Sequence, residues 1–202
     1  MRRPALVPRG ATPTLRIAMY DARMRRAVRV PMVVLGLLAG VSVAGQGPAP
    51  LWVDVTPEAI GATGYWTNKV EIADLNADGR PDLLFANGGD YSTPGTPEPN
   101  QVFLHVGPGF RFEDATTQVL GGIPDLARVI KARDLNDDGL VDIVVGTTYQ
   151  TQSRLFLGTA PGVFREATAT HLPQMPLSVG DLEPGDVDGD GKAESLVGGS
   201  LP

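Results

Sequence analysis

Three short acidic stretches carry oxygen-bearing side chains at every second position. They read DLNADGRPD at residues 74–82, DLNDDGLVD at 134–142 and DVDGDGKAE at 186–194. Each leads at once into a β-prone apolar run: LLFA, IVVG and SLVG. One such stretch could be a solvated turn, but three copies with one internal spacing indicate a shared chemical purpose.

Hard oxygen ligands dominate these three loops. Numbered from its first Asp, each loop has a carboxylate or amide oxygen at positions 1, 3 and 5, glycine at 6 and a carboxylate at 9. Position 7 varies in chemistry, as expected if only its backbone carbonyl is used. The candidate ligands are Asp74, Asn76, Asp78, Arg80 and Asp82; Asp134, Asn136, Asp138, Leu140 and Asp142; Asp186, Asp188, Asp190, Lys192 and Glu194. Such sets suit Ca²⁺, and the absence of Cys and of nearby His argues against Zn²⁺ or Cu²⁺.

The EF-hand shares the first part of this pattern but not its end. An EF-hand loop needs a bidentate Glu at position 12 and flanking helices. Position 12 is Phe85, Val145 and Val197 in the three loops. The sequence therefore excludes an EF-hand and predicts a tighter loop between two strands, closed by the carboxylate at position 9.

The acidic loops belong to a longer internal repeat. Their first Asp residues fall at 74, 134 and 186, and the segments WVDVT (52–56), FEDAT (112–116) and FREAT (164–168) each begin 22 residues earlier. The two periods, 60 and 52 residues, differ mainly by the Pro-rich segment DYSTPGTPEPN at 90–100. Constant spacing with variation in one loop is typical of a structural repeat.

Each repeat unit predicts four short strands. In the first unit these are KVEIA (69–73), DLLFA (82–86), QVFLHV (101–106) and FRFEDAT (110–116), with turn signals between them. We therefore predict an all-β fold of β-propeller blades, each a four-stranded antiparallel sheet. The chain should hold two full blades and parts of two others: LWVDVT (51–56) as the last strand of one blade, and the first half of another at the C-terminal end. Because propellers have four to eight blades, we expect the array to be incomplete at its C-terminus and further blades of the same polypeptide to exist.

The acidic loops and the strands around them resemble those of a known family. DLNADGRPDLLFANG and DLNDDGLVDIVVG resemble the calcium loops of FG-GAP/VCBS repeats, the integrin-α-like β-propellers, and NQVFLHVGPGFRFEDAT resembles the second half of such a blade. The resemblance covers about residues 51–199 and implies structural Ca²⁺ ions. DVDGDGKAESLVG departs from the pattern at Glu194, so we expect the third loop to bind the ion less well than the other two.

Charge divides the chain into a leader and a mature region. Eight of the 17 basic residues precede Gly45, against the single acid Asp21, which leaves nine basic and 22 acidic residues in the remainder. MRRAVRV followed by PMVVLGLLAGVSVAG has the order of a secretory signal peptide. We predict a leader at 1–45, with Met24 as a possible true start and cleavage after Ala44 or Gly45, and repeats at 46–202. An uncleaved membrane anchor is the alternative.

Location and partners follow from this division. We expect a secreted, periplasmic or cell-surface protein with no membrane span once the signal is removed. The acidic remainder disfavours nucleic-acid binding. No G-x-S-x-G, H-E-x-x-H or P-loop motif is present, and neither His105 nor His171 has the sequence context of a catalytic base.

Two functions fit these features. The favoured one is a non-catalytic, exported calcium-binding module that recognises or adheres to a protein or carbohydrate ligand. The exposed candidate for stacking a sugar is Trp66, in GYWTN at 64–68. The alternative is the scaffold of a secreted polysaccharide- or phospholipid-degrading enzyme whose active residues lie outside this chain.

Overall fold

The structure is a computed structural model that describes residues 51–61, 64–90, 92–190 and 192–200. The expected leader at 1–45 lies outside these residues. The chain divides into two units, residues 1–57 and 58–202, and the second holds all the sheets. Within the described residues, no helix has the length and apolar character needed to cross a bilayer.

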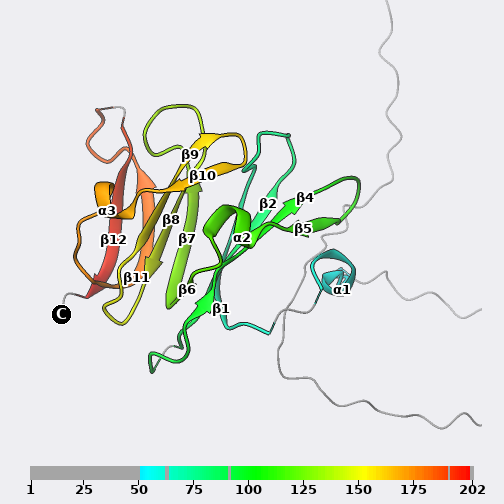
Figure 1. Ribbon diagram of the computed structural model, residues 1–202, viewed down its shortest axis with the longest axis horizontal. Helices are drawn as coiled ribbons and strands as arrows, with labels where there is room; N and C mark the ends of the chain where they lie inside the picture. Colours follow the sequence, from blue (N-terminus) through cyan, green and yellow to red (C-terminus); the bar gives the residue numbers. More distant parts are fainter. Residues whose placement is uncertain (1–50, 62–63, 91, 191, 201–202) are drawn as a thin grey trace, which may run out of the picture. The chain divides into compact units, whose positions relative to one another are not determined.

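Two four-stranded antiparallel sheets form the body of the second unit (Figure 1). The first blade has the strand order β1-β2-β4-β5 and the second blade has the order β7-β8-β9-β10. Their strands are β1 (Thr67–Ala73), β2 (Asp82–Asn87), β4 (Gln101–His105), β5 (Phe112–Asp114), β7 (Ala127–Arg133), β8 (Asp142–Thr147), β9 (Arg154–Ala160) and β10 (Val163–Glu166). The prediction of a mostly-β chain with four-stranded repeat units is confirmed, and both sheets are consistent with propeller blades.

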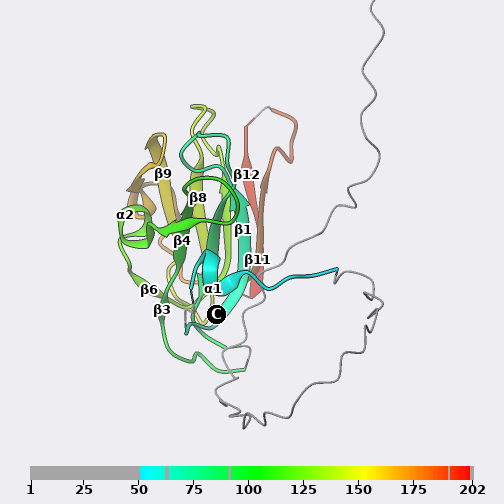
Figure 2. The ribbon, with the colours of Figure 1, turned by 90° about the vertical axis from the view of Figure 1, so that its right-hand side faces the viewer.

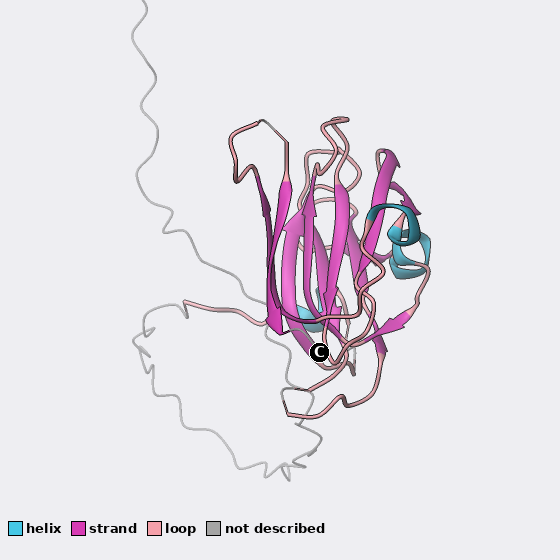
Figure 3. Ribbon diagram, turned by 90° about the vertical axis from the view of Figure 1, so that its left-hand side faces the viewer, coloured by secondary structure: helices cyan, strands magenta, loops and turns pink. Residues whose placement is uncertain are grey.

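The remaining elements are short. The strands β11 (Ser178–Gly185) and β12 (Glu194–Ser200) form a two-stranded sheet, which we call the half blade, and β3 (Glu98–Pro99) pairs with β6 (Pro124–Asp125). The helices are α1 (Thr56–Ala59), α2 (Thr116–Leu120) and α3 (Thr168–His171). Figure 3 shows how strands dominate the described part of the chain. His171 is the last residue of α3.

The prediction of a strand at 51–56 is wrong. Residues 52–55 have no strand structure, and α1 begins at Thr56. A strand needs a hydrogen-bonded neighbour; the matching segments FEDAT and FREAT find one in β4 and β9, whereas no described residue pairs with 52–55. Instead, a short helix begins at the last residue of each of the three segments. Asp54 Oδ1 accepts the Thr56 N–H at 2.9 Å, as Asp114 Oδ1 accepts the Thr116 N–H at 2.8 Å.

Apolar side chains hold the first blade against the second. Leu84 and Val102 of the first blade share one buried cluster with Ile130, Val145 and Phe156 of the second, each no more than 5% exposed. Side chains alternate between the two faces of a strand, so one face of each sheet supplies this layer. Full burial stabilises each such side chain by about 1.5–3 kcal/mol. A second cluster joins the second blade to the half blade.

Charged side chains link the first strands of the three units, with β7 between β1 and β11 (Figure 1). Glu71 of β1 accepts from Arg133 Nη1 at 2.6 Å and lies 3.9 Å from Lys131 Nζ. Lys131 also pairs with Glu183 of β11 at 2.7 Å, and Lys69 of β1 pairs with Asp181 at 3.2 Å. These pairs join strands far apart in sequence.

Candidate metal centre

The three acidic loops lie at the same end of the sheets. They connect β1 to β2, β7 to β8 and β11 to β12, and each begins directly after the first strand of its unit. Figures 1 and 2 show them side by side above the strands. The antiparallel pairing of each strand pair fixes the two ends of its loop.

Backbone N–H groups orient the oxygens at positions 3 and 5. Each position-3 oxygen accepts the N–H of position 5, as Asn76 Oδ1 does from Asp78 at 3.2 Å. Each position-5 carboxylate accepts the N–H of position 7, as Asp138 Oδ1 does from Leu140 at 2.8 Å. The same bonds recur in the other loops. Such local bonds hold the side chains over the loop.

The position-1 carboxylate closes the first two loops. Asp74 Oδ2 and Asp134 Oδ2 accept the N–H groups of Gly79 and Gly139, both at 2.8 Å. Both glycines have positive φ, 80° and 82°, which is the conformation that glycine adopts without steric cost. The sharp turn expected at position 6 is therefore present in the first two loops; position 6 of the third loop, Gly191, lies outside the described residues.

Position 4 also requires a left-handed backbone. Its φ is 58° at Ala77, 59° at Asp137 and 82° at Gly189. Alanine has no side chain with which to stabilise this conformation, which costs an L-residue roughly 1–2 kcal/mol. Position 4 was not among the residues predicted to shape the loop, although Asp and Gly in two of three copies are residues that favour this conformation.

The position-9 aspartates are clamps between strands. Asp82 is fully buried; its Oδ2 accepts from the Leu75 N–H and its Oδ1 from the His105 N–H of β4, both at 2.8 Å. Asp142 is equally buried and accepts from the N–H groups of Leu135 at 2.9 Å and Gly158 at 2.8 Å. Each carboxylate therefore ties its loop to the third strand of its own blade.

Burial raises the pKa of both position-9 aspartates. The N–H bonds work in the opposite direction, and the neighbouring carboxylates at positions 5 and 1 raise the pKa of Asp82 and Asp142 further. The concentration of negative charge is therefore unfavourable by itself. A cation among these oxygens would offset that repulsion.

Position 7 does more in the first loop than the expected carbonyl alone. Arg80 Nη2 lies 2.7 Å from Asp78 Oδ2, and Arg80 Nε donates to the His105 carbonyl at 3.0 Å. Burial alone would raise the pKa of Asp78, but the Arg80 N–H, the Asn76 amide and the Arg80 charge together lower it. Leu140, at the same position of the second loop, offers no such pair.

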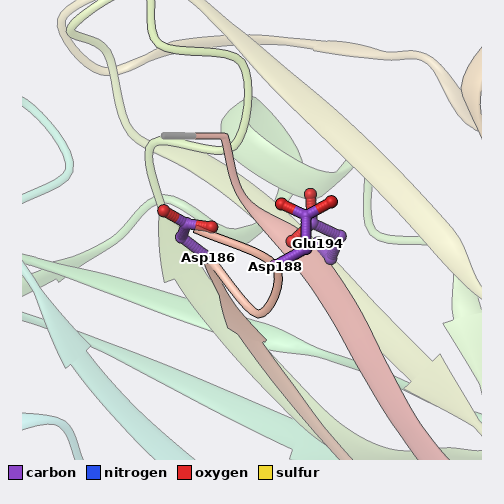
Figure 4. Close-up of side chains that lie close together, drawn as sticks. All are labelled: Asp186, Asp188 and Glu194. Atoms are coloured by element: carbon purple, nitrogen blue, oxygen red, sulfur yellow. The ribbon is translucent and has the colours of Figure 1, made fainter. Parts of the chain in front are cut away.

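In the third loop, three carboxylates converge. Asp186, Asp188 and Glu194 each offer an oxygen within 4.8 Å of the others (Figure 4). Glu194 Oε2 also accepts the Val187 N–H at 2.9 Å, which repeats the bond from position 2 to position 9 found in the other loops. The longer Glu side chain therefore reaches the place that Asp occupies in the first two loops.

A neighbouring blade touches the first loop. Gly162, in the turn between β9 and β10, donates its N–H to the Leu75 carbonyl at 2.9 Å. A Cβ at Gly162 would lie 3.1 Å from the Asn76 Cβ. The hairpin of the second blade thus packs directly on the acidic loop of the first.

Comparison with known families agrees with this architecture. The FG-GAP-like repeat matches residues 74–145 and again residues 134–197, which together cover more than half of the chain. The chain belongs to the FG-GAP-like repeat family. A search of curated proteins gave no match. FG-GAP-like repeats often bind Ca²⁺. Each match begins at the first Asp of one acidic loop and ends in the strand that follows the next acidic loop.

The donor chemistry of the FG-GAP-like loops fits calcium. Positions 1, 3 and 5 are carboxylate or amide oxygens in every copy, and the described residues of the three loops include no nitrogen or sulfur ligand of the kind that Zn²⁺ prefers. The carboxylate oxygens keep a second lone pair when they accept one N–H bond. The loops therefore present preoriented hard ligands.

The sequence also drew attention to the two histidines and to Trp66. His105 stacks on Phe112 with ring centroids 4.8 Å apart, and its Nε2 lies 2.8 Å from the Gly109 carbonyl. Phe103 is buried, whereas Trp66 is 45% exposed, which agrees with its selection as an exposed aromatic. Nothing in the described residues places a catalytic pair around either histidine.

Proposed function

We propose that the chain is an exported, calcium-binding FG-GAP-like module that mediates recognition or adhesion and carries no catalytic site. The observation that supports this most is the threefold recurrence, at one end of the sheets, of loops whose oxygens are held by the same backbone bonds. The ions have a structural role: they neutralise the carboxylates and fix each loop between its two strands.

The stabilisation expected from each ion is modest. Extracellular calcium modules bind with dissociation constants of about 10⁻⁴ to 10⁻³ M. At about 1 mM Ca²⁺, mass action then gives roughly 0.4–1.4 kcal/mol per site. Occupied sites in all loops add about 1–4 kcal/mol, a useful share of the 5–15 kcal/mol typical of a domain.

Calorimetric titration with Ca²⁺, together with thermal melts in Ca²⁺ and in EDTA, tests the metal site. We expect saturable binding and a higher melting temperature in Ca²⁺. Asp138→Ala should remove part of this increment, and Glu113→Gln, which deletes one exposed charge outside the loops, should leave it intact. A melting curve that EDTA does not change contradicts the calcium proposal.

Export rests on the leader. N-terminal sequencing of the protein recovered from cells should start near Gly45 or Gln46, outside the cytoplasm. Recovery of intact Met1 or Met24 in the cytoplasmic fraction contradicts export.

The proposed partners are a protein or carbohydrate ligand and further blades of the same polypeptide. The exposed indole of Trp66 suits stacking against a sugar. Val70 and Ile72 of β1 are 47% and 61% exposed, whereas Ile130 and Ala132, one repeat later, are buried by the first blade. The outer face of the first blade is therefore chemically suited to another blade. Glycan-array binding that depends on Trp66 would support the carbohydrate ligand, and its absence would favour a protein.

A further inference from the structure

Positions 5 and 6 of the first two acidic loops are Asp–Gly pairs, Asp78–Gly79 and Asp138–Gly139. An aspartate followed by glycine can cyclise, because glycine carries no side chain that hinders the approach of its amide nitrogen to the aspartate Cγ. All four residues are exposed. A Cβ added at either glycine would meet no atom within 4 Å outside its chain neighbours, so the surroundings leave room for the ring to form.

The attacking nitrogen is held in the same way in both loops. The Gly79 N–H donates to Asp74 Oδ2 at 2.8 Å, and the Gly139 N–H donates to Asp134 Oδ2 at the same distance. The two glycines have nearly equal φ, 80° and 82°. The difference between the loops lies in the carboxyl group that is attacked.

Arg80 holds the carboxyl group of the first loop. Its Nη2 lies 2.7 Å from Asp78 Oδ2, and its Nε donates to the His105 carbonyl at 3.0 Å. Its backbone N–H donates to Asp78 Oδ1 at 2.9 Å. Both oxygens of Asp78 therefore bind donors of the same residue, and rotation of the carboxyl group toward Gly79 breaks a charge-assisted bond.

The partners of Asp138 in the second loop are neutral. Its Oδ1 accepts from the Leu140 N–H at 2.8 Å, and its Oδ2 accepts from Asn136 Nδ2 at 3.0 Å. Leu140 occupies the position that Arg80 has in the first loop. A neutral hydrogen bond is about half as strong as one made by an ionised group, so the Asp138 carboxyl group turns toward Gly139 more readily.

We propose that Asp138–Gly139 is a site of spontaneous modification, at which aspartate converts to isoaspartate faster than it does at Asp78–Gly79. The Gly139 nitrogen attacks Cγ of Asp138 and forms a C–N bond. One carboxyl oxygen leaves as water, together with the amide hydrogen and a proton from solvent. Water then adds to the main-chain carbonyl carbon of the succinimide, the bond from that carbon to the Gly139 nitrogen breaks, and a proton returns to solvent.

Isoaspartate changes the loop at a position that the proposed metal site uses. The main chain gains a methylene group between positions 5 and 6, and the free carboxyl group is now attached directly to Cα. The oxygens of position 5 therefore leave the place in which the Leu140 N–H holds them. The expected loss of the ion from the second loop rests on the proposed calcium function, whereas the difference in rate between the two loops does not.

Prolonged incubation of the full chain at neutral pH in EDTA measures both sites in the same molecule. Liquid chromatography separates the isomeric peptides, and fragmentation in the mass spectrometer locates the isoaspartate. An exposed ion pair is worth up to about 1 kcal/mol, so isoaspartate should accumulate roughly three- to fivefold faster at Asp138 than at Asp78.

Two matched variants test the role of the guanidinium. Arg80→Leu gives the first loop the residue that the second loop has, and should raise the rate at Asp78 to about that at Asp138. Arg111→Leu removes an exposed arginine outside the loops and should leave both rates unchanged.

Equal rates at the two aspartates, a faster rate at Asp78, or no isoaspartate at either site would overturn the proposal. An Arg80→Leu chain that is folded by circular dichroism and keeps the wild-type rate at Asp78 would also overturn it. If this variant is unfolded, the comparison of the two sites in the wild-type chain decides. A parallel incubation in Ca²⁺ separates the two proposals: if the loops bind no Ca²⁺, it leaves every rate unchanged, while the difference between the sites in EDTA persists.

Discussion

Replacing Asp142 by Ala should destabilise the protein even when no metal is present. This carboxylate is fully buried and is the acceptor for the N–H groups of Leu135 and Gly158. Each buried N–H left without an acceptor costs about 1–3 kcal/mol, so the gross loss is about 2–6 kcal/mol. The raised pKa of Asp142 shows that its charge is also costly to bury, which moves the expected loss to the lower part of that range, about 2–3 kcal/mol.

The second loop contains its own control for this experiment. Asp138 is exposed and accepts the Leu140 N–H near solvent, where water can replace the bond. Asp138→Ala should therefore change the free energy of unfolding in EDTA by no more than about 0.5 kcal/mol, while it removes a proposed calcium ligand. The two variants separate the clamp from the metal site.

Urea denaturation followed by far-UV circular dichroism, in EDTA and in Ca²⁺, measures both effects. For a domain of this size, each kcal/mol corresponds to about 2–4 °C in melting temperature, so Asp142→Ala should melt about 4–12 °C lower. Equal stability of the two variants in EDTA would refute the proposal that the hydrogen bonds of Asp142 stabilise the fold without metal. A loss that appears for Asp142→Ala only in Ca²⁺ would show that its carboxylate serves as a ligand alone.

Three further predictions concern pH, packing and charge. Because burial raises the pKa of the position-9 aspartates above the usual 3.8, calcium affinity measured by calorimetry should fall at a higher pH than for ordinary carboxylates. In EDTA, the part of the stability that comes from protonation of these carboxyl groups should be present at low pH and lost as the pH rises through the raised pKa. Gly146→Ala should lower the melting temperature, with a loss of about 1–3 kcal/mol, because its Cβ would lie 2.6 Å from Val129 Cγ1 and 2.8 Å from Val179 Cγ1; an unchanged melt would contradict this packing. Glu71→Gln should cost about 1–3 kcal/mol and weaken the salt dependence of stability, since Glu71 is only 11% exposed and pairs with Arg133; a variant with the wild-type salt dependence would show that the pair contributes nothing.

The spacing of the repeated segments predicted most strands of the blades correctly, because this spacing depends on local sequence patterns. Strands 69–73 and 82–86 alternate or concentrate apolar residues over short runs bounded by turn residues, and β1 and β2 contain them. The same local reasoning placed the three acidic loops between paired strands. The spacing of the oxygen ligands within a loop depends on nine consecutive residues, so it can be read from the sequence alone.

Contacts between distant residues were beyond that reasoning. Whether 52–56 forms a strand depends on a neighbour that local pattern does not supply, and the helix at Thr56 prevailed. The bond from the His105 N–H to Asp82 joins a loop to a strand more than twenty residues later. The left-handed backbone at Ala77 has no sequence signal of its own; it becomes visible only beside Asp137 and Gly189.

The bond between Gly162 and Leu75 also bears on the order in which the protein is made. Residue 75 leaves the ribosome, or an export channel, well before residue 162. The first acidic loop therefore spends that interval without the hairpin that later packs on Asn76. The first loop gains these contacts only when the second blade has formed. The complete structure of this loop therefore requires that one further blade has been made.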